Sequence, residues 1–159
     1  MGNYIRKIRK KLGHDKFIHP AARILIENEE GEYLFIRKND SGKLGIPAGG
    51  LEEGETIEEC IKREVKEETG LEIISLEVIG IGSSPEKEFV EYWNGDKIQY
   101  FTVEFYSNNW KGKININDRA EIKSANFFDK DTLNDLPENE KSLIESLKYY
   151  RENNVIMLK

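Results

Sequence analysis

One segment, residues 56–70, constrains the fold of this chain more than any other. Thr56 is a favourable N-cap residue, and Glu59 stands three positions later, which is the spacing of a capping box. Gly70 stands where helices commonly end on a left-handed glycine. Between these two ends, apolar residues recur at Ile57, Ile61 and Val65. The segment therefore predicts an amphipathic helix whose apolar side packs on a core.

Acidic residues interrupt the apolar side of this predicted helix. With Ile57 placed at zero, Glu64 falls at about −20° and Glu68 at about +20°, in the middle of the apolar stripe. Glu67 falls at its edge, at about −80°. Burying a carboxylate without a partner costs several kcal/mol, and a divalent cation would offset that cost because hard cations take oxygen ligands. A narrower apolar stripe or a buried arginine is the alternative explanation.

The negative charge of the chain is concentrated around the same segment. The formal net charge is −6, and residues 49–72 account for all of it, with nine glutamates against three basic residues. Acidic and basic residues balance in the rest of the chain. The overall acidity argues against broad nucleic-acid binding.

Composition and length indicate one folded domain. The chain has 159 residues, of which 38% are apolar and 34% charged, which is typical of a globular protein and not of a membrane protein or a disordered one. No apolar run approaches the roughly 20 residues that span a bilayer, and the N-terminus lacks the apolar stretch of a secretory signal. Cys60 is the only cysteine, so we expect no internal disulfide and a cytoplasmic protein without membrane contact.

Hydrophobic periodicity predicts short helices and strands in the rest of the chain, within an α/β or α+β domain. Residues 1–16 form a basic segment with an amphipathic helix over 3–12, and residues 17–159 form the main domain. Two apolar runs, 23–27 and 33–37, flank a turn and predict a β-hairpin. The further predicted elements are a Gly-rich loop over 39–54, strands over 71–81, 98–106 and 122–128, a polar loop or hairpin over 83–95, and a helix over 143–151.

The residues around the acidic helix resemble the signature of the Nudix (MutT-like) hydrolases, G-x5-E-x7-R-E-U-x-E-E-x-G-U, in which U is aliphatic. Here the pattern begins at Gly49, continues at Glu55 and ends with Arg-Glu-Val-Lys-Glu-Glu-Thr-Gly-Leu over residues 63–71. Every defined position matches at the required spacing, so the signal is specific. The resemblance implies an α/β fold, a single-domain Nudix-type α/β/α sandwich with a mixed β-sheet.

The resemblance also implies a reaction and a set of site residues. Enzymes of this family cleave the diphosphate of a nucleoside diphosphate linked to another group, and they release two phosphate-bearing products. By position, the Mg²⁺ ligands of the family match Glu64, Glu67 and Glu68. The backbone carbonyl of Ala48 matches a further ligand, and Mn²⁺ is a possible substitute for Mg²⁺. Glu55 and Arg63 match the pair that orients the catalytic carboxylates.

Members of the family often take a further base or metal ligand from a later loop. Glu121, just before the strand predicted over 122–128, is the preferred candidate for this role. Glu91 and Glu104 are the other acidic residues considered. Each of the three could instead be an ordinary surface glutamate.

Four residues are candidates for substrate binding. Arg37 and Lys38 stand at the end of a predicted strand and could contact phosphate, or they could be ordinary charges at a strand end. Tyr92 and Trp93 could stack on a nucleobase, or they could anchor a hairpin turn beside Asn94.

The sequence thus predicts a Mg²⁺-dependent pyrophosphohydrolase acting on a nucleotide or nucleotide derivative, such as a nucleoside triphosphate or a nucleotide sugar like ADP-ribose. A pyrophosphohydrolase acting on RNA 5′ ends is one alternative, which the basic helix over 3–12 would suit. A non-catalytic nucleotide-binding module is the other, and the intact signature argues against it. We expect no other nucleic-acid partner. A homodimer that packs through the N-terminal helix is left open.

Overall fold

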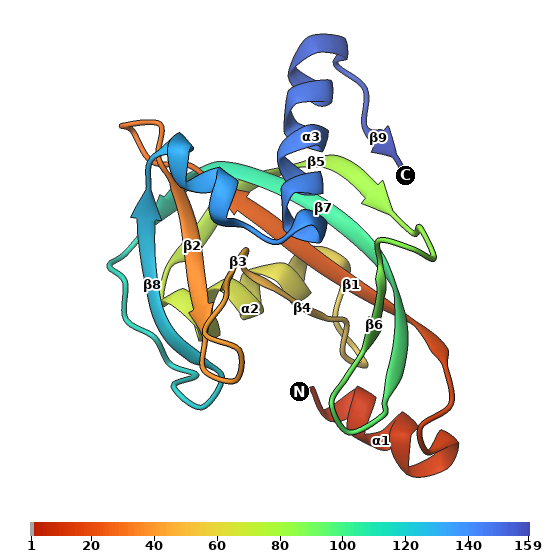
Figure 1. Cartoon of the computed structure of the whole chain (residues 1–159). Coiled ribbons are helices and arrows are strands. Elements are labelled where there is room, and N and C mark those ends of the chain that lie inside the picture. The colour runs from red at the N-terminus through yellow and green to blue at the C-terminus, as the bar shows by residue number, and fades with distance from the viewer. Residues whose placement is uncertain (1) are drawn as a thin grey trace.

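Two β-sheets lie between helices in the computed structural model, which describes residues 2–159 apart from the side chain of Asn139 (Figure 1). The helices are α1 (Asn3–Leu12), α2 (Ile57–Thr69) and α3 (Glu138–Asn153), together with the 3-10 helix η1 (Lys130–Asp135). The strands are β1 (Phe17–Ile26), β2 (Tyr33–Lys38), β3 (Leu44–Gly45), β4 (Ala48–Gly50), β5 (Glu72–Gly82), β6 (Phe89–Glu91), β7 (Lys97–Lys111), β8 (Ile122–Phe128) and β9 (Met157–Leu158).

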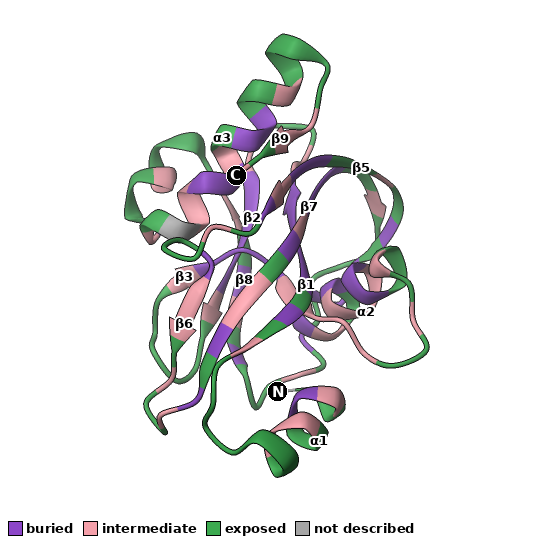
Figure 2. Ribbon diagram, turned by 90° about the vertical axis from the view of Figure 1, so that its right-hand side faces the viewer, coloured by how far each residue is buried: buried purple, intermediate pink, exposed green. Residues whose placement is uncertain are grey.

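The larger sheet is mixed and has helices on both faces. Its strand order is β4-β1-β7-β5-β9, with β6 paired to β7, and the smaller sheet has the order β3-β2-β8. On one face of β1, Ile24 belongs to a core cluster that includes Ile61 of α2. On the other face, Leu25 belongs to a second cluster that includes Leu143 of α3. The buried residues therefore lie mainly in the strands and on the sides of α2 and α3 that face them (Figure 2). The predicted α/β/α sandwich is confirmed.

The predicted hairpin of residues 23–27 and 33–37 is wrong, although the turn between its two runs exists. Asn28 and Gly31 form that turn, in which the Gly31 N–H donates to the Asn28 carbonyl at 3.1 Å. However, β1 and β2 belong to different sheets, and the one bridge described between them joins Glu27 to Tyr33. The physical reason is that β1 is a central strand. One of its edges pairs with β7 in parallel along its whole length, and the other pairs with β4 over residues 21–23, so that β2 meets β1 only at that bridge and pairs with β3 and β8 instead.

Several element boundaries also differ from the predicted ones. The strand predicted over 98–106 extends to Lys111, because β7 pairs with β1 along one edge and with β5 and β6 along the other. The loop predicted over 39–54 contains the short strands β3 and β4, and the loop over 83–95 contains β6. The predicted C-terminal helix begins earlier, at Glu138, after Pro137. The sequence reading missed η1 and β9.

The helix predicted over residues 56–70 is confirmed as α2. The Thr56 hydroxyl accepts a hydrogen bond from the Glu59 N–H at 3.2 Å, and the Glu59 carboxylate accepts one from the Thr56 N–H at 2.8 Å. The capping box is therefore complete. Gly70 ends the helix in the left-handed conformation, with φ 81°. These local signals place the acidic residues of the helix at a defined rotation against the sheet.

Replacing Gly70 by alanine should destabilise the protein more than the same change at Gly42. Both glycines have positive φ, 81° and 66°, so either substitution carries the left-handed penalty of about 1–2 kcal/mol. At Gly70 the new Cβ would also lie 2.3 Å from the carbonyl oxygen of Asn115, whereas no described atom lies within 4 Å at Gly42. We expect Gly70→Ala to lower the free energy of unfolding in urea by about 3 kcal/mol, and Gly42→Ala by about 1 kcal/mol. Equal losses would contradict this packing.

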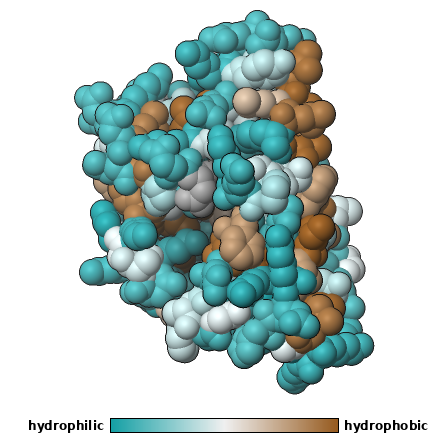
Figure 3. Space-filling view, turned by 45° about the vertical axis from the view of Figure 1, so that its right-hand side comes forward, coloured by the Kyte–Doolittle hydropathy of each residue, from teal (hydrophilic) through white to brown (hydrophobic). Residues whose placement is uncertain are grey.

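The surface is mainly hydrophilic, with apolar side chains gathered along one side (Figure 3). Exposed apolar residues on the larger sheet include Ile18 of β1, Phe101 of β7 and Leu158 of β9. No helix within residues 2–159 is both long and apolar enough to cross a membrane. The homodimer considered from the sequence stays a prediction.

Candidate active site

Three glutamates of α2 differ in exposure in the way that the helical wheel predicts. Glu68 is 7% exposed, the side chain of Glu64 is 16% exposed and that of Glu67 is 46% exposed. The two residues placed in the apolar stripe are thus the more buried ones. Burial without a cation or full hydrogen bonding is unfavourable for carboxylates, so the surroundings of each decide what this helix can do.

Glu68 is buried against β4. Its carboxylate accepts a hydrogen bond from the Ala48 N–H at 3.1 Å. Burial raises the pKa of Glu68 well above its ordinary value, and the charge of Glu64 raises that pKa further, while Lys38 and the Ala48 N–H oppose the rise. The residues of this chain therefore compensate only part of the cost of burying the ionised carboxylate, and a bound cation would supply the remaining stabilisation.

Glu64 packs directly on Gly49, the glycine that begins the signature. A Cβ at Gly49 would lie 1.9 Å from the carboxyl carbon of Glu64, so a side chain at this position would displace the carboxylate. Burial raises the pKa of Glu64, Arg63 lowers it, and the charges of Glu67 and Glu121 raise it again. The required glycine thus has a physical reason, because it leaves the space in which this carboxylate lies.

Gly49→Ala should lower kcat by about 10- to 100-fold, because it forces Glu64 out of its place. The unfolding free energy should change by less than about 1 kcal/mol, since the atoms that give way are the end of a side chain. Steady-state kinetics and urea unfolding measure the two effects. Gly31→Ala, in the turn between β1 and β2 and with φ 77°, is the matched control and should keep the kcat of the unmodified protein. A Gly49→Ala protein with unchanged kcat would show that the position of Glu64 does not matter.

Arg63 joins the helix to the loop between β4 and α2, residues 51–56, which we call the catalytic loop. Its Nε and Nη2 donate to the two carboxylate oxygens of Glu55 at 3.0 and 2.8 Å, a bidentate pair. Its Nη1 donates to Glu64 at 2.7 Å and to Glu67 at 3.4 Å. The bonds from Arg63 lower the pKa of Glu55, and Glu55 in turn raises the pKa of Arg63. One guanidinium thus holds three of the predicted site carboxylates.

The donor set fits a divalent cation in its chemistry. Three carboxylates and the backbone of Ala48 offer hard oxygen ligands on one side of α2, and the two most buried carboxylates have raised pKa values that a cation would reverse. Among the described residues, no group of three histidine, cysteine or acidic side chains already surrounds a common point. Arg63 occupies two of the carboxylates instead. Arg63 bonds one oxygen of each, Oε1 of Glu64 and Oε2 of Glu67, and an ion would bind the other oxygen.

Glu121 lies close to these carboxylates, as its charge raises the pKa of both Glu64 and Glu68. The backbone explains this placement. The N–H groups of Asn117 and Asp118 donate to the Glu67 carbonyl at 3.0 and 2.9 Å, so the segment before β8 is bound to the end of α2. The structure therefore brings Glu121 to the site, and its role as a base stays a prediction. Glu91 is exposed on β6.

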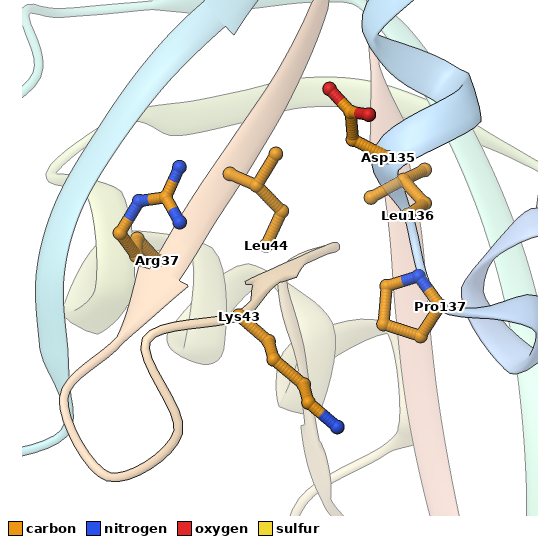
Figure 4. A pocket seen from close by; sticks show the side chains of 6 residues that line it. All are labelled: Arg37, Lys43, Leu44, Asp135, Leu136 and Pro137. Carbon is orange, nitrogen blue, oxygen red and sulfur yellow. The ribbon is translucent and has the colours of Figure 1, made fainter.

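Arg37 lines a pocket with a volume of about 520 Å³. Side chains from the β2–β3 region and from the η1–α3 junction face each other across it (Figure 4). The lining residues are Arg37, Lys43, Leu44, Asp135, Leu136 and Pro137. Lys38 stands next in the chain, and its charge lowers the pKa of Glu68. Of the two predicted phosphate ligands, Lys38 thus lies near the carboxylates of α2, whereas Arg37 lines the pocket and donates to the Gly42 carbonyl at 2.6 Å.

A NUDIX domain model matches residues 17–149 of the chain. The chain belongs to the Nudix family. It is a hydrolase of phosphoric anhydride bonds, a pyrophosphohydrolase that acts on nucleoside diphosphate derivatives. The match begins at β1 and leaves α1 outside it.

Two relatives and one solved structure are similar to this Nudix chain over most of its length. The ADP-ribose pyrophosphatase of Methanocaldococcus jannaschii is 35% identical over 141 residues, which cover 84% of this chain and 76% of that protein. The RNA pyrophosphohydrolase of Wolbachia sp. subsp. Brugia malayi is 30% identical over 128 residues, with 75% and 79% covered. The MutT protein of Methanosarcina mazei Go1 shares the fold, with a TM-score of 0.67, 22% identity, and 89% and 99% covered.

Tyr92 and Trp93 lie in the β6–β7 turn of this Nudix fold, next to α1 rather than α2. The Tyr92 hydroxyl bonds that of Tyr100 at 2.7 Å, and the Tyr92 N–H donates to the carbonyl of Asp96 across the turn. Trp93 is 96% exposed at the tip. These contacts are those of a hairpin anchor. Stacking of either ring on a nucleobase stays a prediction.

Three residues that line the pocket with Arg37 were not predicted from the sequence. Asp135 ends η1, and Leu136 and Pro137 form the turn before α3. Glu140, in the first turn of α3, was also missed. Its Oε2 is buried without a hydrogen-bond partner among the described groups, and burial raises the pKa of Glu140. No periodic signal marks these residues, because their position depends on how α3 packs.

Proposed function

We propose that this Nudix hydrolase is a Mg²⁺-dependent pyrophosphohydrolase of nucleoside diphosphate sugars of the ADP-ribose class. The similarity over most of both chains to an ADP-ribose pyrophosphatase is the observation that carries the choice of substrate. The buried pair of carboxylates on α2, each with a raised pKa, supports the requirement for a cation. Mn²⁺ should substitute for Mg²⁺, because both accept carboxylate oxygens.

The residues of this chain would share the work as follows. Mg²⁺, when bound, would neutralise the diphosphate and make a bound water more acidic. Glu64, Glu67 and Glu68, with the Ala48 carbonyl, are its proposed ligands. Arg63 and Glu55 keep these side chains in place through the bonds described above. Glu121 would accept a proton from the attacking water, and Arg37 and Lys38 would hold phosphate oxygens.

RNA 5′ ends are the second candidate substrate. The relative from Wolbachia is named an RNA pyrophosphohydrolase and matches three quarters of this chain. In addition, α1 exposes Arg6, Lys10 and Lys11, and it contacts the catalytic loop through Lys7 and Glu53. Exposed basic residues near the site would attract a polyanion.

A substrate panel tests this assignment. ADP-ribose, a UDP-sugar, nucleoside triphosphates, dinucleoside polyphosphates and 5′-triphosphorylated RNA would each be assayed with Mg²⁺ and with Mn²⁺. We expect the highest kcat/KM for ADP-ribose, which with one water yields AMP and ribose 5-phosphate. A higher kcat/KM for RNA that falls on Lys10→Glu/Lys11→Glu substitution would favour the second candidate. Tight nucleotide binding without product from any substrate would indicate a non-catalytic module instead.

A further inference from the structure

The N-terminal helix α1 lies outside the part of the chain that matches the family model, yet it docks on the catalytic loop. The backbone N–H of Tyr4 donates to the carboxylate of Glu52 at 2.9 Å. Lys7 pairs with Glu53 at 2.8 Å. In Figure 1, α1 accordingly lies below the loop that follows β4. The helix therefore touches the segment that carries Glu55 without belonging to the signature.

The contact between Tyr4 and Glu52 serves both partners. Gly2, the N-cap of α1, has no side chain with which to satisfy the free N–H groups of the first turn. The carboxylate of Glu52 takes this place from 48 residues away in the sequence. A negative charge at a helix N-terminus is also favoured by the helix dipole. The first turn of α1 thus fixes the Glu52 side chain.

Glu52 in turn holds the catalytic pair. Its own backbone N–H donates to Oε1 of Glu55 at 2.8 Å. The same carboxylate receives the two bonds from Arg63, and Arg63 bonds Glu64. A continuous series of hydrogen bonds therefore runs from α1 to a proposed metal ligand.

A buried aromatic cluster below α1 strengthens this docking. His19 is 1% exposed, and its ring stacks on Tyr4 with 5.7 Å between the ring centres. Neither ring nitrogen has a hydrogen-bond partner among the described groups, so the imidazole serves here as a packing surface. It lies directly under Gly50, where a Cβ would come within 2.3 Å of Nε2 and 3.5 Å of Ile5. Side chains of α1 and β1 thus pack against Gly50, directly before the catalytic loop.

From these contacts we propose that α1 is a positioning element for catalysis, acting through Glu52 on Glu55 and Arg63. The proposal rests on the function proposed above, in which Arg63 and Glu55 orient the carboxylates. Glu52 and α1 need not touch substrate. Their effect is to reduce the freedom of the catalytic loop before substrate binds, which lowers the cost of reaching the reactive arrangement.

Variants at Glu52 and Glu58 separate this role from general stability. Glu52→Ala should speed hydrogen exchange in residues 51–55 of the metal-free, full-length protein by about five- to tenfold, as loss of a helix-capping carboxylate would. With substrate, kcat should fall by about the same factor and KM should change less than about twofold, because the altered residue acts on the loop and not on the ligand. Glu58→Ala, which removes an exposed ion pair with Lys62 on α2 and makes no contact with α1 among the described residues, is the matched control and should leave both measurements unchanged.

Glu52→Gln provides the rescue test, since an amide oxygen still accepts the Tyr4 N–H. It should restore slow exchange and most of kcat. A second pair of variants tests the donor, because Tyr4→Ala keeps the N–H while Tyr4→Pro removes it. Proline at this position also disfavours the helical conformation of Asn3, so the additional loss in Tyr4→Pro over Tyr4→Ala is an upper limit for the hydrogen bond.

Three results would overturn the proposal. The first is a Glu52→Ala protein with the hydrogen-exchange rates and kcat of the unmodified protein, and the second is a Glu52→Gln protein with the same losses as Glu52→Ala. The third is equal exchange rates and kcat in Tyr4→Pro and Tyr4→Ala. The exchange measurement needs neither substrate nor metal. It therefore tests the contact between α1 and Glu52 even if no substrate in the panel is hydrolysed. That result would contradict the proposed function but not the docking of α1.

Discussion

Glu68→Gln should lower kcat by about a thousandfold while the protein stays folded. Glutamine has the size of glutamate and still accepts the hydrogen bond from the Ala48 N–H, but it lacks the negative charge that a cation requires. Folding raises the pKa of Glu68. In the metal-free protein, the ionised carboxylate therefore lowers the free energy of unfolding at pH values above the ordinary pKa of a glutamate. The metal-free variant should therefore unfold at a temperature no lower than that of the unmodified protein at pH 7.

Glu58→Gln is the matched control for this experiment. Glu58 lies on the same helix but is exposed and pairs with Lys62 at 2.6 Å. Its replacement should leave kcat within about twofold. Initial rates with saturating Mg²⁺ and thermal unfolding without metal measure both effects. A Glu68→Gln protein that keeps a tenth or more of the activity would exclude Glu68 as an essential ligand.

Glu104→Ala should lower the free energy of unfolding by about 3–5 kcal/mol. Glu104 is fully buried and accepts hydrogen bonds from Arg23, at 3.0 Å from Nε, and from Ser146. Lys159 lies 3.1 Å away. Removing the carboxylate leaves two cations with less compensation inside the protein, and such uncompensated charge is expensive.

Urea unfolding of three variants measures this effect. Glu104→Gln keeps the shape of the side chain and loses its charge, so its unfolding free energy should fall less than that of Glu104→Ala. It can therefore be measured even if Glu104→Ala does not fold. Glu72→Ala removes two exposed ion pairs, with Lys66 and Lys111, and should cost less than about 1 kcal/mol. A Glu104→Ala loss as small as that of Glu72→Ala would mean that the buried pair contributes nothing net.

Local signals were sufficient to predict the part of the fold that carries chemistry. Thr56, Glu59 and Gly70 define α2 within its own segment, and the rotation of the helix follows from the spacing of its apolar residues. The sequence therefore predicted that Glu64 and Glu68 would be the more buried glutamates. The Nudix signature adds their chemical meaning.

Pairings over long distances in the sequence could not be predicted in this way. The wrong hairpin shows this for strands, because the apolar runs of β1 and β2 carry no information on which sheet each joins. Arg23 and Glu104 show it for side chains, since they lie 81 residues apart and meet only because β1 and β7 pair in register. Glu104 was considered as a catalytic base, and the structure instead places it in a buried ion pair with Arg23.

The same difference between local signals and long-range contacts holds for the candidate site. Glu55 and Arg63 are eight residues apart and were assigned by the signature. The pocket formed with the η1–α3 turn was not predicted, because it depends on where α3 packs. Glu121 was a choice among several acidic residues, and its nearness to α2 depends on how the segment before β8 binds the helix end.

Anomalous diffraction tests the central claim most directly. Crystals would be soaked with MnCl₂ and a non-hydrolysable analogue of ADP-ribose, and data would be collected at the manganese edge. The account predicts at least one anomalous peak at bonding distance from carboxylate oxygens of Glu64, Glu67 and Glu68, in contact with the diphosphate. A bound analogue with those three carboxylates still held by Arg63 and Ala48, and no manganese beside them, would contradict it.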